Sequence, residues 1–164
     1  MSNLYLMMGC PGAGKSTWLK KYIAKDLNSK IVSRDQIRFS LVEENEEYFS
    51  HEKQVYNDYI YYINNWLRSD FDVYADATHL NVASRRKLLN HIYVETESIS
   101  IIYIKTPLFI SLEQNKKREG TRAYVPESQL RRMYYQIEEP TFEEGFDNIY
   151  IIEPNKTIQI RKRE

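Results

Sequence analysis

The sequence of 164 residues is poor in several features that define large protein classes. A single cysteine, Cys10, excludes an internal disulfide framework and a thiolate metal cluster, and it fits an intracellular, reducing setting. The longest apolar stretches have the length of a strand, so no membrane-spanning segment is expected. The N-terminal MSNLYLMMG lacks a basic region, which predicts no signal peptide. We therefore expect a cytoplasmic protein.

The chain also has no net charge at pH 7, because 23 Lys and Arg residues balance 23 Asp and Glu residues. A protein that coats nucleic acid without specificity is usually basic, so a polyanionic partner would have to be held locally. The charges are unevenly spread, with acidic EENEE at 43–47 and basic stretches at 85–87 and 116–132. A solvated surface is the ordinary interpretation of such runs.

Segments typical of strands and of helices alternate along the chain. Short apolar and β-branched runs predict five strands, at 3–8, 30–33, 72–75, 98–105 and 148–152. Helices are expected at 12–27, 35–41, 51–68, 82–94, 107–117 and 126–138, and a charged tail follows the last strand. This alternation predicts one α/β domain over residues 1–164, with a five-stranded parallel sheet and helices on both of its faces.

Residues 9–17, GCPGAGKST, match the pattern G-x-x-x-x-G-K-[ST] at Gly9, Gly14, Lys15 and Ser16. The motif lies between a predicted strand and a predicted helix, where a phosphate-binding loop requires it. Its backbone N–H groups and the helix N-terminus suit phosphate oxygens. We expect Lys15 to reach the β- and γ-phosphates, Ser16 to ligate Mg²⁺ and Thr17 to contact the α-phosphate. The expected ATP-binding residues of the loop are Gly12, Ala13, Gly14, Lys15, Ser16 and Thr17.

The alternative for this loop is a glycine-rich turn that binds nothing. If the loop binds a nucleoside triphosphate, it still does not separate kinases from GTPases, motor ATPases or switches. The chain has no N-K-x-D signature of guanine binding and no hydrophobic run that ends in D-E, as motor ATPases usually have. In its place, VYADAT ends a predicted strand at Asp76. Cys10 is not expected to be a nucleophile, since no histidine lies near it in the sequence.

The segment SRDQIR follows the second predicted strand and places Asp35 and Arg38 one helical turn apart, on one face. A phosphotransferase needs a carboxylate that accepts the proton of the attacking hydroxyl. An arginine that holds an anionic acceptor in line also assists transfer. The alternative is an aspartate that caps the helix beside a surface arginine.

The segment DATHLNVASRR follows the third predicted strand, at an edge where open α/β sheets bind ligands. Asp76 and Thr78 are therefore expected beside the phosphate loop, with Asp76 supporting Mg²⁺ through water or orienting a lid arginine. The alternative is that one of them caps the next helix, although Asn81 is the better candidate for that cap.

Three further polar residues of this segment are not expected to take part in binding or catalysis. His79 could be a ligand or an acid, but a lone histidine in a loop is more often neither. Arg85 and Arg86 are expected on the surface, with acceptor contact as the less favoured alternative.

The segment KKREGTRAYVP places Arg118 and Arg122 in a glycine-containing connection between two predicted helices. This is the lid position of small phosphotransferases, where mobile arginines close over the donor phosphates. The alternative for the charge run alone is a solvated loop.

Taken in order, these blocks resemble the 5′-hydroxyl polynucleotide kinases, which are phage-type and bacterial end-healing enzymes. GCPGAGKSTW resembles the phosphate loop of that family, SRDQIR its R-D-x-x-R acceptor block, and NKKREGTRAYVPESQLRRMY its lid. DATHLN resembles its D-x-T-N-type block but has His79 where Asn is common. The blocks span residues 9 to about 135, essentially the whole kinase domain.

The resemblance implies a three-layer P-loop kinase fold with sheet order 2-3-1-4-5, an arginine-bearing lid at about 118–126, and ATP and Mg²⁺ as cofactors. Asp35 would be the general base on the 5′-hydroxyl, and Arg38 would hold the phosphate beside the attacked nucleotide. Arg122, assisted by Arg118, would clamp the donor phosphates. The implied catalytic residues are Lys15, Asp35, Arg38 and Arg122. The implied acceptor-binding residues are Arg34, Asp35, Arg38, Asp76 and Thr78.

The sequence also departs from many members of that family. No D-x-D-x-T phosphatase motif is present, so we expect only the kinase half of end healing, with any phosphatase or ligase on a separate chain. A stand-alone kinase of this kind would suit a phage genome.

Two alternatives to a polynucleotide kinase remain open. The first alternative is a P-loop kinase for a small-molecule hydroxyl, such as a nucleoside or an antibiotic. The second is a nucleotide-dependent switch. The pocket for the adenine base is only guessed, near EPNK at 153–156.

Overall fold

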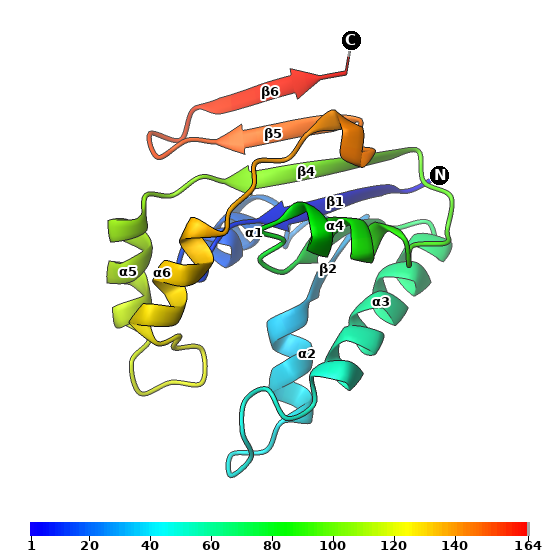
Figure 1. Ribbon diagram of the computed structural model, residues 1–164. Coiled ribbons are helices and arrows are strands. Elements are labelled where there is room, and N and C mark those ends of the chain that lie inside the picture. The colour runs from blue at the N-terminus through cyan, green and yellow to red at the C-terminus, as the bar shows by residue number, and fades with distance from the viewer. Residues whose placement is uncertain (164) are drawn as a thin grey trace.

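The computed structural model describes residues 1–163 and contains one mixed sheet of six strands (Figure 1). The strands are β1 (Asn3–Met8), β2 (Ser29–Ser33), β3 (Asp72–Asp76), β4 (Ser98–Ile104), β5 (Asn148–Ile152) and β6 (Ile158–Lys162). They lie in the order β2-β3-β1-β4-β5-β6, and the first five are parallel. The predicted order 2-3-1-4-5 is confirmed, and the predicted count of five strands was one too few.

The additional strand β6 is antiparallel to β5 and forms the edge of the sheet. A tight turn joins the two strands: the Glu153 N–H donates to the Thr157 carbonyl over 2.9 Å, and Lys156 adopts a φ of 65°. All five residues of β6 are exposed. The sequence suggested only a charged tail in this region. Its Arg161 and Lys162 lie on an open edge, where charges discourage pairing with another chain.

Six α-helices and one short 3₁₀ helix connect the strands. They are α1 (Lys15–Tyr22), α2 (Arg34–Leu41), α3 (Glu52–Arg68), α4 (Val82–Leu89), α5 (Leu108–Lys116), α6 (Glu127–Tyr135) and η1 (Phe142–Glu144). Two helices end about five residues before their predicted ends at 27 and 94. After α4, the side chain of Asn64 in α3 bonds the His91 carbonyl and the Tyr93 N–H, and these bonds hold the backbone in a non-helical path.

The helices cover the two faces of the sheet unequally. On one face α3 and α4 bury Tyr59, Ile63 and Leu88 against the central strands, in the larger of the two sheet cores. On the other face the smaller core receives Leu19 from α1. There, Tyr5 of β1 and Tyr74 of β3 stack with ring centroids 4.5 Å apart. Within residues 1–163, no helix combines the length and the apolar character needed to cross a bilayer.

The parallel arrangement brings four connections to one edge of the sheet (Figure 1). The loop after β1 leads into α1, and β2 leads directly into α2. The turn after β3 precedes α4, and β4 leads through Pro107 into α5. Because the carboxyl ends of parallel strands form the ligand-binding edge of open α/β sheets, this edge is the candidate site.

Candidate active site

The loop after β1 has the tight geometry of an anion-binding turn. Gly14 caps α1 with a φ of 105°, and Gly12 has a φ of 81°, both in the left-handed region that favours glycine. A Cβ atom added to Gly12 would lie 2.6 Å from the Ser111 carbonyl oxygen of α5. The loop therefore packs directly against α5, and position 12 accepts no side chain without movement of the backbone.

Lys15 is the central cation of this loop. Its Nζ donates to the carbonyl oxygens of Gly9 and Cys10, over 2.7 and 3.0 Å. Burial lowers the pKa of Lys15 below its ordinary value, and the nearby carboxylate of Asp76 opposes that shift. Ser16 stands exposed at the start of α1, so its hydroxyl is accessible to a ligand. Burial raises the pKa of the Cys10 thiol to about 11, which agrees with the expectation that it is no nucleophile.

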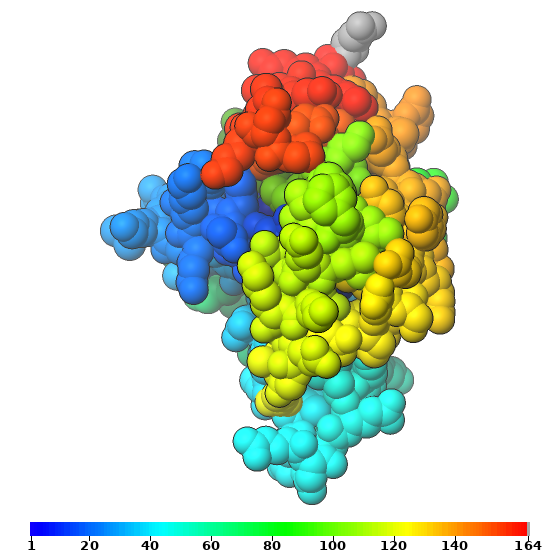
Figure 2. Space-filling view, turned by 90° about the vertical axis from the view of Figure 1, so that its left-hand side faces the viewer, coloured from blue at the N-terminus to red at the C-terminus, as the bar shows by residue number. Residues whose placement is uncertain are grey.

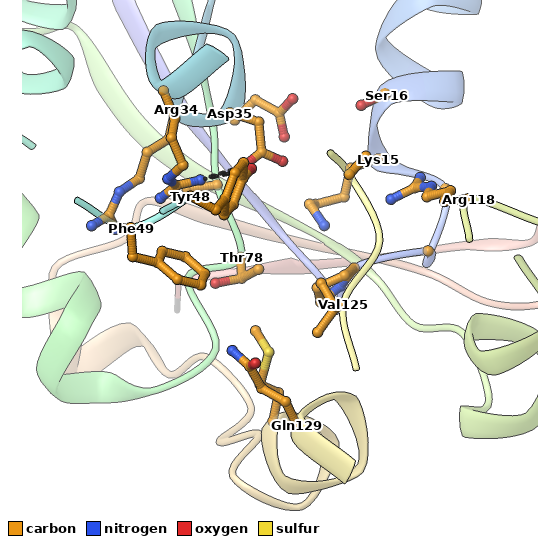
Figure 3. Close-up of a pocket in the computed structure, with 18 residues that line it drawn as sticks. Lys15, Ser16, Arg34, Asp35, Tyr48, Phe49, Thr78, Arg118, Val125 and Gln129 are labelled. Atoms are coloured by element: carbon orange, nitrogen blue, oxygen red, sulfur yellow. Dashed lines mark hydrogen bonds and ion pairs between the residues drawn. The ribbon is translucent and has the colours of Figure 1, made fainter. Parts of the chain in front are cut away.

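A central cavity of about 190 Å³ lies beside the loop (Figure 3). In this view Asp35 and Arg34 stand on one side of the cavity, and Lys15, Ser16 and Arg118 stand on the other. The predicted site residues that line it are Gly12, Gly14, Lys15, Ser16, Arg34, Asp35, Arg38, Asp76, Thr78 and Arg118. Three predicted residues do not line it: Ala13, Thr17 and Arg122. The structure thus brings most of the predicted donor and acceptor residues to one cavity.

Helix α2 presents Asp35 toward this cavity because another residue caps the helix. The Ser33 hydroxyl accepts the Gln36 N–H over 3.2 Å, so the alternative that Asp35 is the cap was wrong. One oxygen of Asp35, Oδ1, accepts from Nη1 of Arg38 over 2.5 Å and from the Tyr48 hydroxyl over 3.1 Å. The side chain is 63% exposed, which leaves the other oxygen, Oδ2, available to a substrate.

Arg38 is buried, so the alternative that it is a surface arginine was wrong. Glu52 at the start of α3 receives Nε and Nη2 of Arg38 in a bidentate pair, with both distances 2.7 Å. The guanidinium also lies 4.9 Å from the Tyr48 ring and 5.3 Å from the Phe49 ring. Burial alone would lower the pKa of Arg38, but hydrogen bonds to Glu52 and Tyr48 raise it above its ordinary value. Arg38 therefore stays charged and fixes the direction of Asp35.

Sequence reasoning missed the contribution of residues 42–50, of which it noted only the acidic run EENEE at 43–47. Tyr48 and Phe49 of this segment line the central cavity, and Glu52 anchors Arg38. Two adjacent aromatic residues at the end of EENEEYF were the only local signal. Their role depends on how the segment folds back onto α2, where Tyr48 packs on Phe39 with ring centroids 5.9 Å apart.

Asp76 ends β3 beside the loop and is buried. Burial raises the pKa of Asp76; Lys15 opposes the shift, and the negative charge of Asp35 adds to it. Two nearby carboxylates and the Ser16 hydroxyl therefore offer oxygen atoms in one cavity, and a cation would relieve their repulsion. This donor set fits Mg²⁺, which usually takes one or two carboxylates together with substrate phosphates. Among the described residues, no group of three His, Cys, Asp or Glu forms a metal site by itself.

The turn after β3 is tied to the phosphate loop by buried polar contacts. The Thr78 carbonyl accepts the Gly9 N–H over 3.0 Å. His79 is buried; its Nδ1 lies 2.5 Å from the Met7 carbonyl and its Nε2 lies 3.1 Å from the Tyr59 hydroxyl. Burial lowers the pKa of His79 to about 4, so the ring is neutral near pH 7. These contacts give His79 a structural role, in line with the expectation that a lone histidine in a loop is more often neither a ligand nor an acid.

Helix α4, which follows this turn, confirms one expectation and contradicts another. Asn81 caps the helix, because its side chain accepts the Ser84 N–H over 2.8 Å. Arg85 was expected on the surface, and this was wrong, since its side chain is completely buried. Glu144 receives it through two bonds of 2.7 and 3.1 Å, and the His79 carbonyl accepts its Nη1 over 2.9 Å. Arg86 is exposed, as expected.

The connection between α5 and α6 holds Arg118 and Arg122, the two arginines predicted for a lid, in different places. Arg118 lines the central cavity. Arg122 instead donates from Nη2 to the Val42 carbonyl, and its guanidinium lies 5.3 Å from the Phe39 ring. Figure 2 shows this connection, in yellow, next to the cyan segment around residue 45. The side chain of Asn115 bonds both the Val125 carbonyl and the Val125 N–H, over 2.6 and 3.0 Å, and so closes the base of the connection.

A second cavity of about 690 Å³ lies on the other side of the loop. It opens between α1, α5 and the turn that joins β5 to β6, visible in Figure 2 between the blue, green and red-orange surfaces. Ala13 and Thr17 of the loop line it, together with Trp18 and the segment Glu153–Pro154. The guessed EPNK segment therefore borders a cavity that continues from the phosphate loop.

Comparisons with known proteins find kinases among the relatives of this chain. An L-seryl-tRNA(Sec) kinase from Methanococcus maripaludis is 29% identical over 148 residues, which cover 88% of this chain and 56% of that protein. The chain thus spans about half the length of that curated relative. The model of the AAA domain family (AAA_33) matches residues 4–140.

Solved structures share the fold. A Pnkp1/Rnl/Hen1 RNA repair complex contains a chain with a TM-score of 0.67 and 25% identity, covering 82% of this chain and 43% of that one. Kti12 from Chaetomium thermophilum, in complex with ADP-AlF3, has a TM-score of 0.65 and 15% identity, over 93% and 92%. A sugar kinase from Janibacter sp. has a TM-score of 0.62 and 14% identity, over 92% and 84%. The chain belongs to the AAA domain family and has an α/β P-loop kinase-like fold, with a mixed central sheet flanked by helices.

Proposed function

We propose that this protein is an ATP-dependent kinase that transfers the γ-phosphate to a 5′-hydroxyl end of DNA or RNA. The observation that carries the proposal is the central cavity, where Asp35 faces Lys15 and Ser16 of the phosphate loop. An acceptor hydroxyl between them would meet a carboxylate on one side and the donor phosphate on the other. The 25% identity to a chain of an RNA repair complex supports a nucleic-acid acceptor.

The donor half of this proposal rests on the phosphate loop and its two flanking cavities. Lys15 would exchange the carbonyl oxygens of Gly9 and Cys10 for phosphate oxygens, which carry more charge. Ser16 and Asp76 would hold Mg²⁺, which when bound neutralises charge on the phosphates. Thr17 would contact the α-phosphate and lead toward the base, for which the cavity beside the β5–β6 turn is the proposed pocket.

The acceptor half uses Asp35 as the general base. The proton of the 5′-hydroxyl passes to Asp35, the 5′-oxygen forms a bond to the γ-phosphorus, and the bond to the β–γ bridging oxygen breaks, releasing ADP. Arg38 and Tyr48 already bond Oδ1 of Asp35, so they direct Oδ2 toward the acceptor. Arg38 together with Arg34, which also lines the cavity, would hold the phosphate beside the attacked nucleotide.

The lid completes the proposed site. Arg118 lines the central cavity and would contact the donor phosphates directly. Arg122 would join it only after leaving the Val42 carbonyl, so its role as a clamp requires closure of the connection between α5 and α6.

An acceptor panel with ATP labelled on its γ-phosphate tests this function. It should contain single-stranded and recessed 5′-hydroxyl oligonucleotides of DNA and RNA, a set of nucleosides, a set of sugars, and seryl-tRNA. We expect label on the 5′-hydroxyl ends, and none with Lys15→Ala, which lacks the loop cation. Label on nucleosides or sugars alone would overturn the proposal in favour of a small-molecule kinase.

A second candidate function has one specific observation in its favour. The curated relative at 29% identity is an L-seryl-tRNA(Sec) kinase, so the acceptor hydroxyl could be a seryl group carried by RNA rather than a 5′ end. The chemistry at Asp35 would be the same, because both acceptors are primary hydroxyls attached to a polyanion. Label on seryl-tRNA in the absence of label on 5′-hydroxyl ends would establish this second function.

The proposal also concerns partners and the switch alternative. As a kinase for 5′ ends, the protein would work beside a separate phosphatase or ligase chain, and the RNA repair complex offers a precedent for separate partners.

A switch that binds nucleotide without an acceptor would keep its ATP turnover when Asp35 is changed to Asn. Loss of phosphate transfer in that variant supports the kinase.

A further inference from the structure

A third cavity lies between α3 and α4, which are neighbours on one face of the sheet (Figure 1). We call it the α3–α4 groove. Its volume is about 570 Å³, larger than the 190 Å³ of the central cavity. The residues of the groove that carry the argument are Arg34, Lys53, Tyr56, Ser84, Lys87 and His91. Neither the phosphate loop nor the proposed base pocket contributes to it.

Tyr56 is the centre of the groove and is surrounded by basic side chains. Nζ of Lys87 lies 4.4 Å from the centroid of its ring, and the guanidinium carbon of Arg34 lies 5.3 Å from it. The His91 ring packs edge-on at 6.2 Å. An aromatic ring among cations is the arrangement with which proteins bind single-stranded nucleic acid, because bases stack on the ring and phosphates meet the charges.

The groove also contains polar atoms without partners. Among the described residues, two buried side-chain atoms in the groove have no hydrogen-bond partner: Nε of Arg34 and the hydroxyl of Tyr56. Burial raises the pKa of Tyr56, so its hydroxyl keeps its proton and can donate. Both atoms are then donors, and leaving buried donors unpaired is costly. A ligand that supplies acceptor oxygens, such as a phosphodiester, would satisfy them.

The charges of the groove favour an anion. Arg34, Lys53 and Lys87 contribute three cations, whereas the single carboxylate that lines the groove, Glu52, is already held by Arg38. Arg34 makes only a loose contact of 3.6 Å with Glu52. The chain as a whole has no net charge, so this is a local concentration of positive charge.

The groove lies directly beside the central cavity. Arg34, Ala77 and Thr78 line both. In Figure 3, Arg34 and Thr78 stand on the side of the central cavity that also carries Asp35. A polymer with its 5′ end at Asp35 can therefore continue past Arg34 into the groove, whereas a small molecule would end in the central cavity.

We propose that the α3–α4 groove binds the acceptor strand beyond its 5′-terminal nucleotide, as a single strand with a base against Tyr56 and the next phosphodiester, beyond the phosphate held at Arg34, against Lys87. This inference rests on the proposed kinase function, because it extends the acceptor site of that function. It predicts a preference for acceptors longer than one nucleotide and for ends that are not paired.

The first experiment measures KM and kcat for a series of single-stranded 5′-hydroxyl acceptors: a nucleoside 3′-monophosphate, a dinucleotide, a trinucleotide and a hexanucleotide. KM should fall with length, on the order of tenfold, because each added base can stack. Tyr56→Ala and Lys87→Ala should remove this dependence and leave the kinetics of the 3′-monophosphate unchanged. The matched controls are Tyr61→Ala on α3 and Arg86→Ala on α4, which replace exposed residues outside the groove.

Two results would overturn the groove while the kinase function stands. One is a KM that does not depend on acceptor length in the unchanged protein. The other is a Tyr56→Ala variant that raises KM for the 3′-monophosphate as much as for the hexanucleotide, since this would place Tyr56 at the terminal nucleotide.

The second experiment measures binding without catalysis and separates the two failures. Fluorescence anisotropy with a labelled single-stranded hexanucleotide should show weaker binding by Tyr56→Ala, again on the order of tenfold. Lys87→Ala should reduce the slope of log affinity against log salt by about 0.7, the value for one phosphate contact in a single strand. If no acceptor is phosphorylated yet these shifts appear, the proposed function fails and the groove stands. Unchanged affinity in both variants overturns the groove.

Discussion

Arg38 and Arg85 are two buried arginines that look alike in their immediate contacts and differ in their surroundings. The side chain of Arg38 is 8% exposed and that of Arg85 is 0% exposed, and a glutamate holds each guanidinium through Nε and Nη2. The glutamates differ, because Glu52 is 31% exposed whereas Glu144 is 3% exposed. Arg38 also lines the central cavity, and Arg85 lines none of the three cavities.

The difference shows that burial and ion pairing alone do not identify a functional arginine. The third contact decides: Nη1 of Arg38 bonds a carboxylate that faces open space, whereas Nη1 of Arg85 bonds the backbone carbonyl of His79. A guanidinium that directs an exposed carboxylate can prepare it for proton transfer. A guanidinium saturated by a buried carboxylate and a carbonyl can only hold elements together, here α4 and η1.

The largest expected effect tests the Arg38 side of this comparison. Asp35→Asn removes the proton acceptor but keeps the size of the side chain, so kcat for transfer should fall by about 10²–10⁴-fold. Thermal unfolding should change little, because Asp35 is 63% exposed. The check is the initial rate with a saturating oligonucleotide acceptor, with the melting temperature measured alongside. A rate within a few fold of the unchanged protein would contradict the role of Asp35.

The next effect tests the Arg85 side. Arg85→Ala leaves Glu144 charged and buried without its partner, which should lower the free energy of unfolding by about 3–5 kcal/mol. The matched variant Arg38→Ala leaves Glu52 partly exposed, where water can solvate it, so its loss should be closer to about 1 kcal/mol. Urea unfolding of the two variants measures both values. Equal losses would break the comparison.

Much of the fold and the donor site was predictable because the signals are local. The phosphate loop occupies nine consecutive residues, and Asp35 and Arg38 are three residues apart on one helix. The five parallel strands are short apolar runs bounded by loops, and alternation with helices sets their parallel direction. The strand order came from the resemblance to polynucleotide kinases, and the structure agrees with it.

The remainder depends on contacts between distant residues. Arg85 meets Glu144 across 59 positions, and nothing beside Arg85 in the sequence indicates that partner. Glu52 begins a helix 14 residues after Arg38, and the sequence predicts that helix without indicating which arginine Glu52 would bind. Strand β6 has only two apolar residues at alternate positions, Ile158 and Ile160, and this pattern is too short to separate a strand from a charged tail. Such features appear only when the chain is folded.

A smaller effect concerns the pH dependence of stability that arises from His79, whose carbonyl bonds Arg85. Burial lowers the pKa of His79 to about 4, below its value near 6.5 in an unfolded chain, and the charges of Arg34, Lys15 and Arg85 add to this. The unfolded state therefore binds the extra proton, and stability falls as pH drops from about 6.5 toward 4. Between pH 7 and pH 5 the loss should be about 2 kcal/mol.

Urea unfolding at pH 7 and pH 5 tests this expectation, with His79→Gln expected to reduce the difference between the two values. His91→Gln replaces an exposed histidine and serves as the control that should keep the difference. An unchanged pH dependence in His79→Gln would mean that other groups set the acid stability.

The smallest expected effect concerns the caps of the two helices that bear these arginines. Ser33 caps α2, which bears Asp35 and Arg38, and Asn81 caps α4, which bears Arg85. Replacing either cap by Ala should lower the free energy of unfolding by about 1 kcal/mol. Only Ser33→Ala should also lower kcat, by a few fold, because fraying of the first turn of α2 displaces Asp35 from the acceptor. Paired measurements of unfolding and initial rate compare the two variants. Equal losses of rate would mean that either helix end reaches the central cavity, and the contrast between a catalytic and a structural arginine would then not extend to their helices.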